Sequence, residues 1–167
     1  SAASDVYKRQ LLDKTIFEVE ISNSGPKSYE TATVMKMPAS FAEFSDALQK
    51  ARIKDGSFCK NELTCIHYNG LTHAMIGWNA NLYDLNLFAQ RLASLTEEQK
   101  KGMDALLKIK QNHRVAPIPL NQLINLTYNT DICCFAPRVS NHEELGAFLY
   151  ANEMLSNEAM ALLDTTE

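Results

Sequence analysis

The chain has 167 residues, of which 46% are hydrophobic and 22% are charged, and its formal net charge is −4 at pH 7. These proportions are ordinary for a globular protein, and the length allows either one domain or two small lobes that share one core. A membrane-spanning helix is not expected, because no segment approaches the roughly 20 apolar residues that it needs. The first residues also lack the hydrophobic region of a signal peptide, so we expect a cytoplasmic protein.

Residues 1–10, SAASDVYKRQ, differ in character from the rest of the chain. The segment DVYKRQ resembles the translation of a transposase-adapter sequence that contaminates the ends of genes predicted from metagenomic assemblies. We therefore expect residues 1–10 to be adapter-derived or disordered, and the fold prediction begins at Leu11.

Residues 11–78 are predicted to form an antiparallel ββαβ lobe. Polar and apolar residues alternate over residues 15–22, which is typical of a strand with one solvated face, and a turn-forming cluster at 23–28 leads into a second strand over 29–37. The next helix starts with a capping box between Ser40 and Glu43, and its predicted apolar face comprises Phe41, Phe44, Ala47, Leu48 and Ala51. A third strand is expected over residues 62–68, and residues 67–79 are interpreted as loop and linker.

Residues 79–167 are predicted to form a helical lobe, so the protein belongs to the α+β class. Asn81 can cap a first helix, whose buried stripe is Leu82, Leu85, Ala89, Leu92 and Leu95. A second helix starts at Thr96 and buries Met103, Leu106 and Leu107. The short corner between these helices indicates an αα-hairpin.

Two further helices are expected in this lobe. One follows Pro117 and Pro119 and continues the buried face with Leu120, Leu123, Ile124 and Thr127. Residues 132–136 are either a short buried strand or an extended connection. The last helix starts at Asn141, and its apolar residues are Leu145, Phe148, Leu149 and Met154.

Charge is distributed unevenly along the chain. From residue 139 to the end the sequence has no Lys or Arg and six carboxylates, namely Glu143, Glu144, Glu153, Glu158, Asp164 and Glu167. By contrast, residues 97–114 hold five basic and three acidic side chains. Acid is therefore concentrated near the C-terminal end.

Several stretches together resemble a known family. They are the alternating first strand, PASFAEFSDALQKARI, LYDLNLFAQRLASLTEEQ, PIPLNQLINLTYNTDICCF and NHEELGAFLYAN. From about Phe17 to about Asn152 the chain resembles the ArdA-type antirestriction proteins and their relatives on mobile genetic elements of gut bacteria. The resemblance implies an elongated α/β homodimer that imitates the charge of bent DNA and occupies the DNA-binding groove of a type I restriction–modification enzyme. Members of that family continue into a further acidic segment, so a truncated gene end is expected at Glu167.

On this basis the sequence predicts a non-enzymatic inhibitor that needs no cofactor or metal and does not bind nucleic acid itself. A CRISPR nuclease is an equally suitable target, because it also presents a basic DNA groove. The predicted acidic contact surface comprises Glu143, Glu144, Glu153, Glu158, Glu18 and Glu20. Duplex DNA carries a charge about every 1.7 Å, so a helix of roughly 40 Å would have to replace over 20 phosphates. The C-terminal acids alone are too few, so imitation either needs the carboxylates of Glu18, Glu20, Glu30 and Glu43 together with a second subunit, or it is only partial.

Parts of the sequence also fit other functions. A scaffolding or protein-interaction module of a mobile element is the main alternative, with Trp78 and Tyr83 either forming an exposed aromatic anchor or packing between the lobes. The basic residues of 97–114 are better explained as a solvated helix face than as a nucleic-acid site, because acids are interspersed among them.

Enzymatic or metal-dependent function is the least favoured alternative. The residues Cys59, Cys65, His67 and His73 form C-x5-C-x-H-x5-H, which is not a standard zinc spacing, although Cys65 and His67 share one strand face. A nucleophile at Cys133 or Cys134, with His142 and Asp131 as partners, is conceivable, but nothing in the sequence positions it. Reduced, partly buried thiols are the expected state of all four cysteines.

Overall fold

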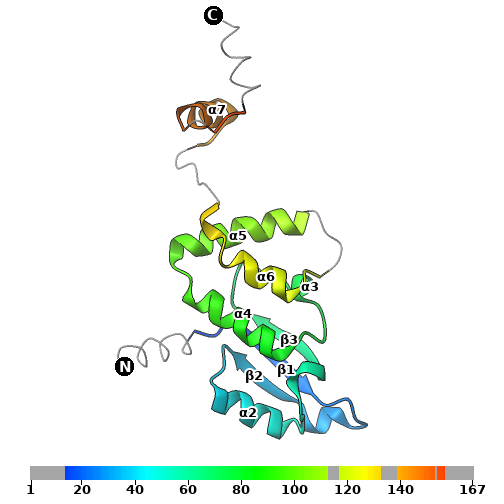
Figure 1. Cartoon of the computed structure of the whole chain (residues 1–167). Coiled ribbons are helices and arrows are strands. Elements are labelled where there is room, and N and C mark those ends of the chain that lie inside the picture. Colours follow the sequence, from blue (N-terminus) through cyan, green and yellow to red (C-terminus); the bar gives the residue numbers. More distant parts are fainter. Residues whose placement is uncertain (1–13, 113–116, 133–138, 153, 157–167) are drawn as a thin grey trace, which may run out of the picture. The chain divides into compact units, whose positions relative to one another are not determined.

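A computed structural model describes residues 14–112, 117–132, 139–152 and 154–156 (Figure 1). Residues 1–10, for which an adapter-derived or disordered segment is predicted, lie outside the described residues. The chain divides into two compact units, Ser1–Cys133 and Cys134–Glu167, and each is treated by itself. The described elements of the first unit are β1 (Phe17–Ser22), η1 (Ser28–Thr31), β2 (Thr33–Met37), α2 (Phe41–Lys50), η2 (Gly56–Phe58), β3 (Lys60–Ile66), α3 (His73–Ile76), α4 (Leu82–Ser94), α5 (Glu97–Asn112), α6 (Leu120–Leu126) and η3 (Thr130–Ile132). The second unit contains α7 (His142–Ala151).

The strands form one antiparallel sheet in the order β2-β1-β3, which confirms the predicted α+β class and the ββαβ order. β1 is central, with Val19 opposite Met35 on β2 and opposite Leu63 on β3. Successive side chains of a strand point to opposite faces. Phe17, Val19 and Ile21 are accordingly buried, while Glu18 and Glu20 lie on the other face.

The strand ends differ from the prediction. β2 starts at Thr33 instead of residue 29, because the preceding turn continues to Thr31 and is held by a hydrogen bond of 3.1 Å from Asn23 Nδ2 to Thr31 Oγ1. β3 starts at Lys60, two residues before the predicted strand, because Lys60 pairs with Ser22 at the end of β1. The predicted loop over 67–79 contains the short helix α3.

Helix α2 starts as predicted. The Ser40 side chain accepts from the Glu43 amide, and the Ser40 amide donates 2.8 Å to Glu43 Oε2, so the capping box is complete. These hydrogen bonds from Ser40 hold the pKa of Glu43 below its ordinary value. Phe41, which was assigned to the buried face, is 89% exposed, because the helix turns Phe44 and Ala47 toward the core instead.

Helix α4 also starts at the predicted cap, where Asn81 Oδ1 accepts from the amides of Tyr83 and Asp84. The corner to α5 is short, and Thr96 and Gln99 exchange side-chain and backbone hydrogen bonds there. In their packing, however, α4 contacts mainly α6, and α5 contacts mainly η3. Gly102 permits the second contact, because a Cβ at this position would collide with the Thr130 carbonyl oxygen.

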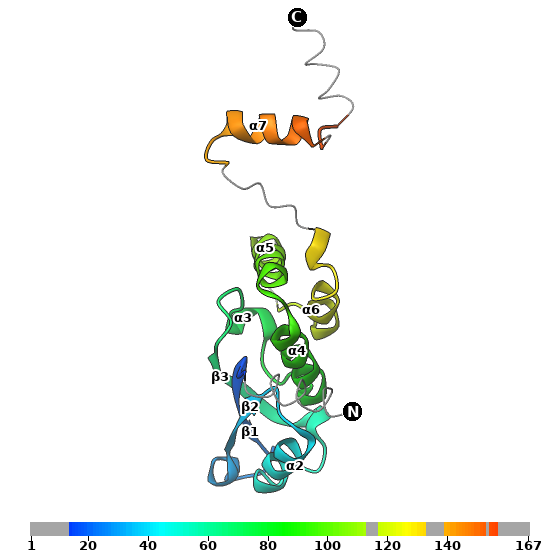
Figure 2. The ribbon, with the colours of Figure 1, turned by 90° about the vertical axis from the view of Figure 1, so that its left-hand side faces the viewer.

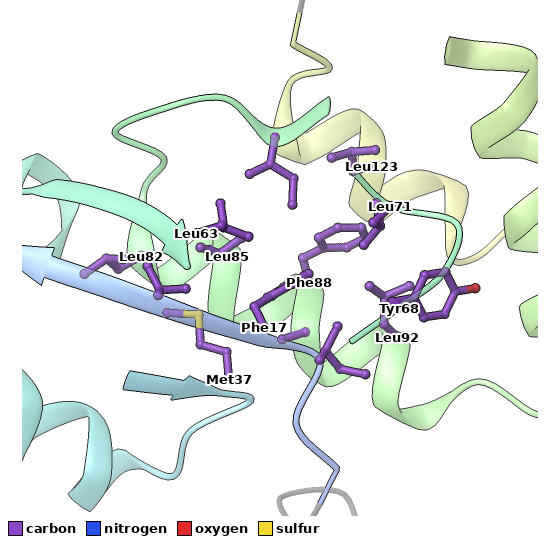
Figure 3. Close-up of a cluster of buried hydrophobic side chains, with 14 of the residues drawn as sticks. Phe17, Met37, Leu63, Tyr68, Leu71, Leu82, Leu85, Phe88, Leu92 and Leu123 are labelled. Atoms are coloured by element: carbon purple, nitrogen blue, oxygen red, sulfur yellow. The ribbon is translucent and has the colours of Figure 1, made fainter. Parts of the chain in front are cut away.

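The described residues of the predicted first lobe share one core with the helices α4, α5 and α6 of the predicted second lobe. The Phe17 ring on β1 lies 6.0 Å from the Phe88 ring on α4, and Met37, Leu63, Leu71, Leu92 and Leu123 lie around them (Figure 3). Burial raises the pKa of the Tyr68 phenol, whose hydroxyl donates 3.1 Å to the Lys100 carbonyl oxygen on α5. The core thus continues from the sheet into the helices.

Hydrogen bonds from two asparagines join segments far apart in the sequence. Asn86 on α4 pairs with both backbone groups of Ala39, at 2.8 and 3.1 Å. Asn61 on β3 pairs in the same way with Ala80, at 2.6 and 3.1 Å. Buried backbone groups need such hydrogen-bond partners. The Asn86 side chain therefore holds the segment before α2 against α4, and the Asn61 side chain holds the segment before α4 against β3.

In the second unit, α7 starts at the predicted cap, Asn141, whose Oδ1 accepts 2.8 Å from the Glu144 amide. The apolar residues predicted for its buried face are not buried, and Leu145 and Tyr150 are exposed. In the part of the chain that the structure describes, no helix combines the length and the hydropathy needed to cross a bilayer.

Candidate binding surface on the sheet

The face of the sheet opposite the core carries charged and polar side chains from all three strands. Glu18 and Glu20 of β1 lie there, with Lys36 opposite Glu18 and Val34 opposite Glu20 on β2. On the other side of β1, Glu62 of β3 lies opposite Glu20. Figure 2 shows the sheet turned by 90° from the view of Figure 1, with α2 and α4 beside it.

Glu20 and Glu62 are two carboxylates in directly opposite positions. Like charges in such a pair destabilise a sheet. Neither carboxylate has a hydrogen-bond or ion-pair partner among the described residues. The pair is therefore available to a cation that comes from outside the described chain.

A groove of about 950 Å³ lies beside this pair. Its polar lining includes Glu20, Glu62, Thr64 and His73, and its apolar lining includes Leu63, Ala74, Trp78 and Pro117. A smaller depression of about 310 Å³, with Ser22, Lys60 and Asn79 in its wall, shares Glu20, Glu62 and Trp78 with the groove. Both depressions thus combine the acid pair with the same aromatic ring.

Trp78 is 73% exposed, so of the two predicted roles the packing role between lobes is wrong. Its backbone lies between two residues of positive φ, Gly77 at 77° and Asn79 at 56°. The Asn79 amide donates 3.3 Å to the Asn61 carbonyl oxygen, which holds this turn against β3. Tyr83, the other predicted anchor, stacks on Phe44 at 5.1 Å between ring centroids.

The predicted acidic residues fall into three groups. Glu18 and Glu20 are on the sheet, and Glu143 and Glu144 are in the first turn of α7, which belongs to the other unit. Glu153 and Glu158 lie outside the described residues. Hydrogen bonds from the amide and hydroxyl of Ser140 to Glu144 Oε2, at 2.7 and 2.8 Å, lower the pKa of Glu144. This carboxylate therefore caps α7, and Glu143 is the freer of the two.

Glu62 was not among the predicted site residues. The sequence does indicate that Glu62 lies on the open face, because the buried residues Asn61 and Leu63 alternate with Glu62 and Thr64 along β3. Its importance depends on the pairing with Glu20, and that register is decided by the fold.

The four residues of the weighed metal pattern do not come together. Cys59 is buried, and burial raises the pKa of its thiol, while His73 lines the groove. Cys65 and His67 lie together, with Cys65 Sγ 4.0 Å from His67 Nδ1. The third member of their cluster is Glu18 on the neighbouring strand.

The remaining candidates contribute less. Cys133 and Cys134 lie outside the described residues, so the weighed nucleophile stays a hypothesis. On α5, Lys100 forms an ion pair with Glu97, and its hydrogen bond lowers the pKa of Glu97. This pairing agrees with a solvated helix face.

Comparisons with protein-family models, with curated proteins and with solved structures returned no match. The function of the chain is therefore inferred from the chemistry of the sheet surface and from the resemblance to ArdA-type proteins.

Proposed function

We propose that this protein is a non-enzymatic, cytoplasmic inhibitor of a bacterial DNA-targeting defence enzyme, either a type I restriction–modification enzyme or a CRISPR nuclease. It binds the basic DNA-binding groove of that enzyme through carboxylates that stand in for phosphates. The observation that carries the proposal is the carboxylate pair Glu20 and Glu62, which has no partner among the described residues and lies beside exposed Trp78. The resemblance to ArdA-type proteins supplies the class of target.

The chemistry of the surface suits arginine and lysine side chains. Carboxylates accept charge-assisted hydrogen bonds from a guanidinium group, as phosphates do. An indole face attracts the same cation, and Arg also stacks on it. A basic groove made for DNA supplies such side chains in number.

The sheet surface imitates only a short piece of a DNA backbone. Neighbouring strands lie about 4.8 Å apart, so Glu20 and Glu62 supply two charges over a length in which duplex DNA carries about three. Lys36 and Lys60 are exposed on the same face and reduce its negative charge. A second subunit, or the acids of α7 and of the residues that follow it, adds the remaining charge in this proposal.

A protein-interaction module is the second candidate, and the groove itself favours it. Leu63, Ala74 and Pro117 give the groove an apolar side next to Trp78. Exposed Trp is a frequent anchor in protein interfaces. A partner held in this way would be nearly indifferent to salt, whereas contacts between exposed opposite charges are screened over about 8–10 Å.

A competition titration separates the two candidates. Purified defence enzyme, labelled duplex DNA and the protein are mixed at low and at moderate salt. We expect the protein to displace the duplex and to bind more weakly as salt rises. Simultaneous binding of protein and duplex, with an affinity that salt does not change, would rule out DNA mimicry.

Two sets of variants then locate the contact. The first is Glu20→Lys with Glu62→Lys on the sheet, and the second reverses Glu143, Glu144, Glu153 and Glu158 to Lys. Glu98→Lys, on the exposed side of α5, is the matched control. We expect the sheet variant to lose displacement while the control retains it, with cooperative unfolding preserved in all, because exposed charges contribute little to stability.

A further inference from the structure

Three possible metal ligands meet at one end of the open sheet face. A carboxylate oxygen of Glu18, Sγ of Cys65 and one ring nitrogen of His67 all lie within 4.8 Å of one another. His67 Nε2 is 3.9 Å from Glu18 Oε1, and His67 Nδ1 is 4.0 Å from Cys65 Sγ. Glu18 lies on β1, Cys65 lies on the neighbouring strand β3, and His67 directly follows the last residue of β3.

A β-bulge brings Cys65 to this position. Val19 pairs with Leu63, but Glu18 pairs with Cys65, so Thr64 and Cys65 together oppose one residue of β1. Such a bulge re-aims a side chain and is common beside functional sites. The Thr64 hydroxyl donates 2.9 Å to the Glu18 carbonyl oxygen and fixes the irregularity.

Regular strand geometry resumes after the bulge. The His67 amide donates 2.8 Å to the Ile16 carbonyl oxygen, which extends the pairing of the two strands beyond β3. Cys65 and His67 are two residues apart, so alternation places them on the same face. The adjacency of the three side chains is thus a product of register.

We propose that Glu18, Cys65 and His67 bind one Zn²⁺ ion and leave its fourth position open to solvent or to an external ligand. Thiolate, imidazole and carboxylate are the ligands that Zn²⁺ takes in proteins, at about 2.3, 2.0–2.1 and 2.0–2.2 Å. Tetrahedral geometry with these bond lengths places ligand atoms roughly 3.4–3.6 Å apart. The observed 3.9 and 4.0 Å separations are measured from the two different ring nitrogens of His67, and only one of these nitrogens can bind the ion. With one ligand atom from each residue, the three atoms lie within 4.8 Å of one another, so side-chain rotations must bring them closer by up to about 1.2 Å.

The side chains have room for these rotations. Those of Glu18 and His67 are 30% and 45% exposed, so neither is locked by packing. The Glu18 carboxylate lies toward His67. Among the described residues it forms no ion pair with Lys36, although Lys36 lies directly opposite Glu18 on β2. The rival explanation is an ordinary His–Glu ion pair beside a thiol, which would have no affinity for zinc.

This inference departs from the expectation that the chain binds no metal. The sequence pattern combined Cys65 and His67 with Cys59 and His73, whereas the fold places Glu18 of the neighbouring strand beside them. The inference does not rest on the proposed inhibitory function, although the two share Glu18. Zinc binding is measured on the isolated chain without any target, so either proposal can fail alone.

The test is a Zn²⁺ titration of the full chain against a chromophoric chelator. The background carries Cys133→Ser and Cys134→Ser, because an adjacent pair of thiols could bind metal independently. We expect one equivalent of Zn²⁺ to bind. Glu18→Gln, Cys65→Ser and His67→Ala should each weaken binding at least about tenfold, since loss of even an outer partner of a metal ligand costs 10–100-fold.

Two controls remove the same residue types outside the cluster. Glu20→Gln on β1 and His73→Ala on α3 should leave the zinc affinity unchanged. His67→Gln serves if His67→Ala does not fold by circular dichroism. Co²⁺ in place of Zn²⁺ should give the intense visible bands of four-coordinate cobalt and a near-ultraviolet thiolate charge-transfer band that Cys65→Ser removes. No stoichiometric binding by the parent, or binding that all three ligand variants retain, would overturn the proposal.

Discussion

The two faces of the sheet are made from alternate residues of the same strands, yet different forces shape them. On the buried face, Phe17, Val19 and Ile21 are fully enclosed by β2, β3 and the helices. On the open face, Glu20 and Glu62 oppose each other and their carboxylates form no ion pair or hydrogen bond within the part of the chain that the structure describes, and exposed Trp78 lines the same groove. The buried face is stabilised by its contacts, whereas the open face retains an unfavourable pair.

This difference indicates that the buried face mainly stabilises the fold, whereas the open face mainly serves binding. A pair of like charges on opposite residues of two strands lowers the free energy of unfolding. Native proteins keep such unfavourable pairs mainly at functional sites. The buried face should therefore tolerate few changes and the open face many. Three substitutions test this contrast, and a fourth, at a helix cap that belongs to neither face, serves as a reference; they follow in order of decreasing effect.

The largest effect is expected at Leu92, a fully buried residue of α4. Leu92→Ala should lower the free energy of unfolding by about 2–5 kcal/mol, because the cavity cannot fully collapse. Val34→Ala, on the open face, is the control and should cost under about 1 kcal/mol. Denaturant melts give both values, and a loss below half a kcal/mol at Leu92 would contradict the packing of α4 described here.

The next effect concerns how the open face presents Trp78. Gly77 has φ 77°, and a Cβ there would lie 2.9 Å from Pro117 Cγ. Gly77→Ala should cost about 1–3 kcal/mol through backbone strain and should shift the tryptophan fluorescence. Gly146→Ala in α7 is the control and should raise stability by about 0.5–1 kcal/mol, because an added Cβ there meets nothing within 4 Å and Ala is the better helix former. A Gly77→Ala variant as stable as the parent would show that the turn before Trp78 is not constrained.

A smaller effect is expected at the cap of α2, which belongs to neither face. Ser40→Ala should cost about 1 kcal/mol at neutral pH. The folded pKa of Glu43 is lowered from 4.5 by its hydrogen bonds from Ser40, so this contribution is present above pH 4.5 and is lost as pH falls through the folded pKa. The gap between Ser40→Ala and the parent should narrow in acid, while Ser45→Ala, an exposed residue of the same helix, should show no such pH dependence.

The smallest effect has the opposite sign. Glu62→Gln should raise the free energy of unfolding by about 0.2–1 kcal/mol, because it removes the like charge opposite Glu20. Glu20→Gln should give a similar gain, and the double variant should gain nothing further. Added salt should shrink the gain, and a destabilising Glu62→Gln would mean that the pair is not a functional compromise.

Local patterns predicted the secondary structure well where the signal lies within a few residues. Ser40 with Glu43, Asn81, and Thr96 with Gln99 start helices where their spacing indicated, because a cap bonds to amides within its own first turn. Period-two alternation likewise predicted which residues of β1 are buried. Boundaries were less accurate, as at β2, because turn residues and strand residues there are similar in character.

The sequence by itself thus determined the α+β class, the helix starts and the division of β1 into buried and open residues, because each depends on contacts between near neighbours in the chain. Tertiary structure decided the rest. Register placed Glu62 opposite Glu20, and the bulge placed Cys65 and His67 beside Glu18, while packing left Phe41 and Trp78 exposed. These arrangements depend on hydrogen bonds between strands distant in sequence, and a shift by one residue would move every side chain to the other face.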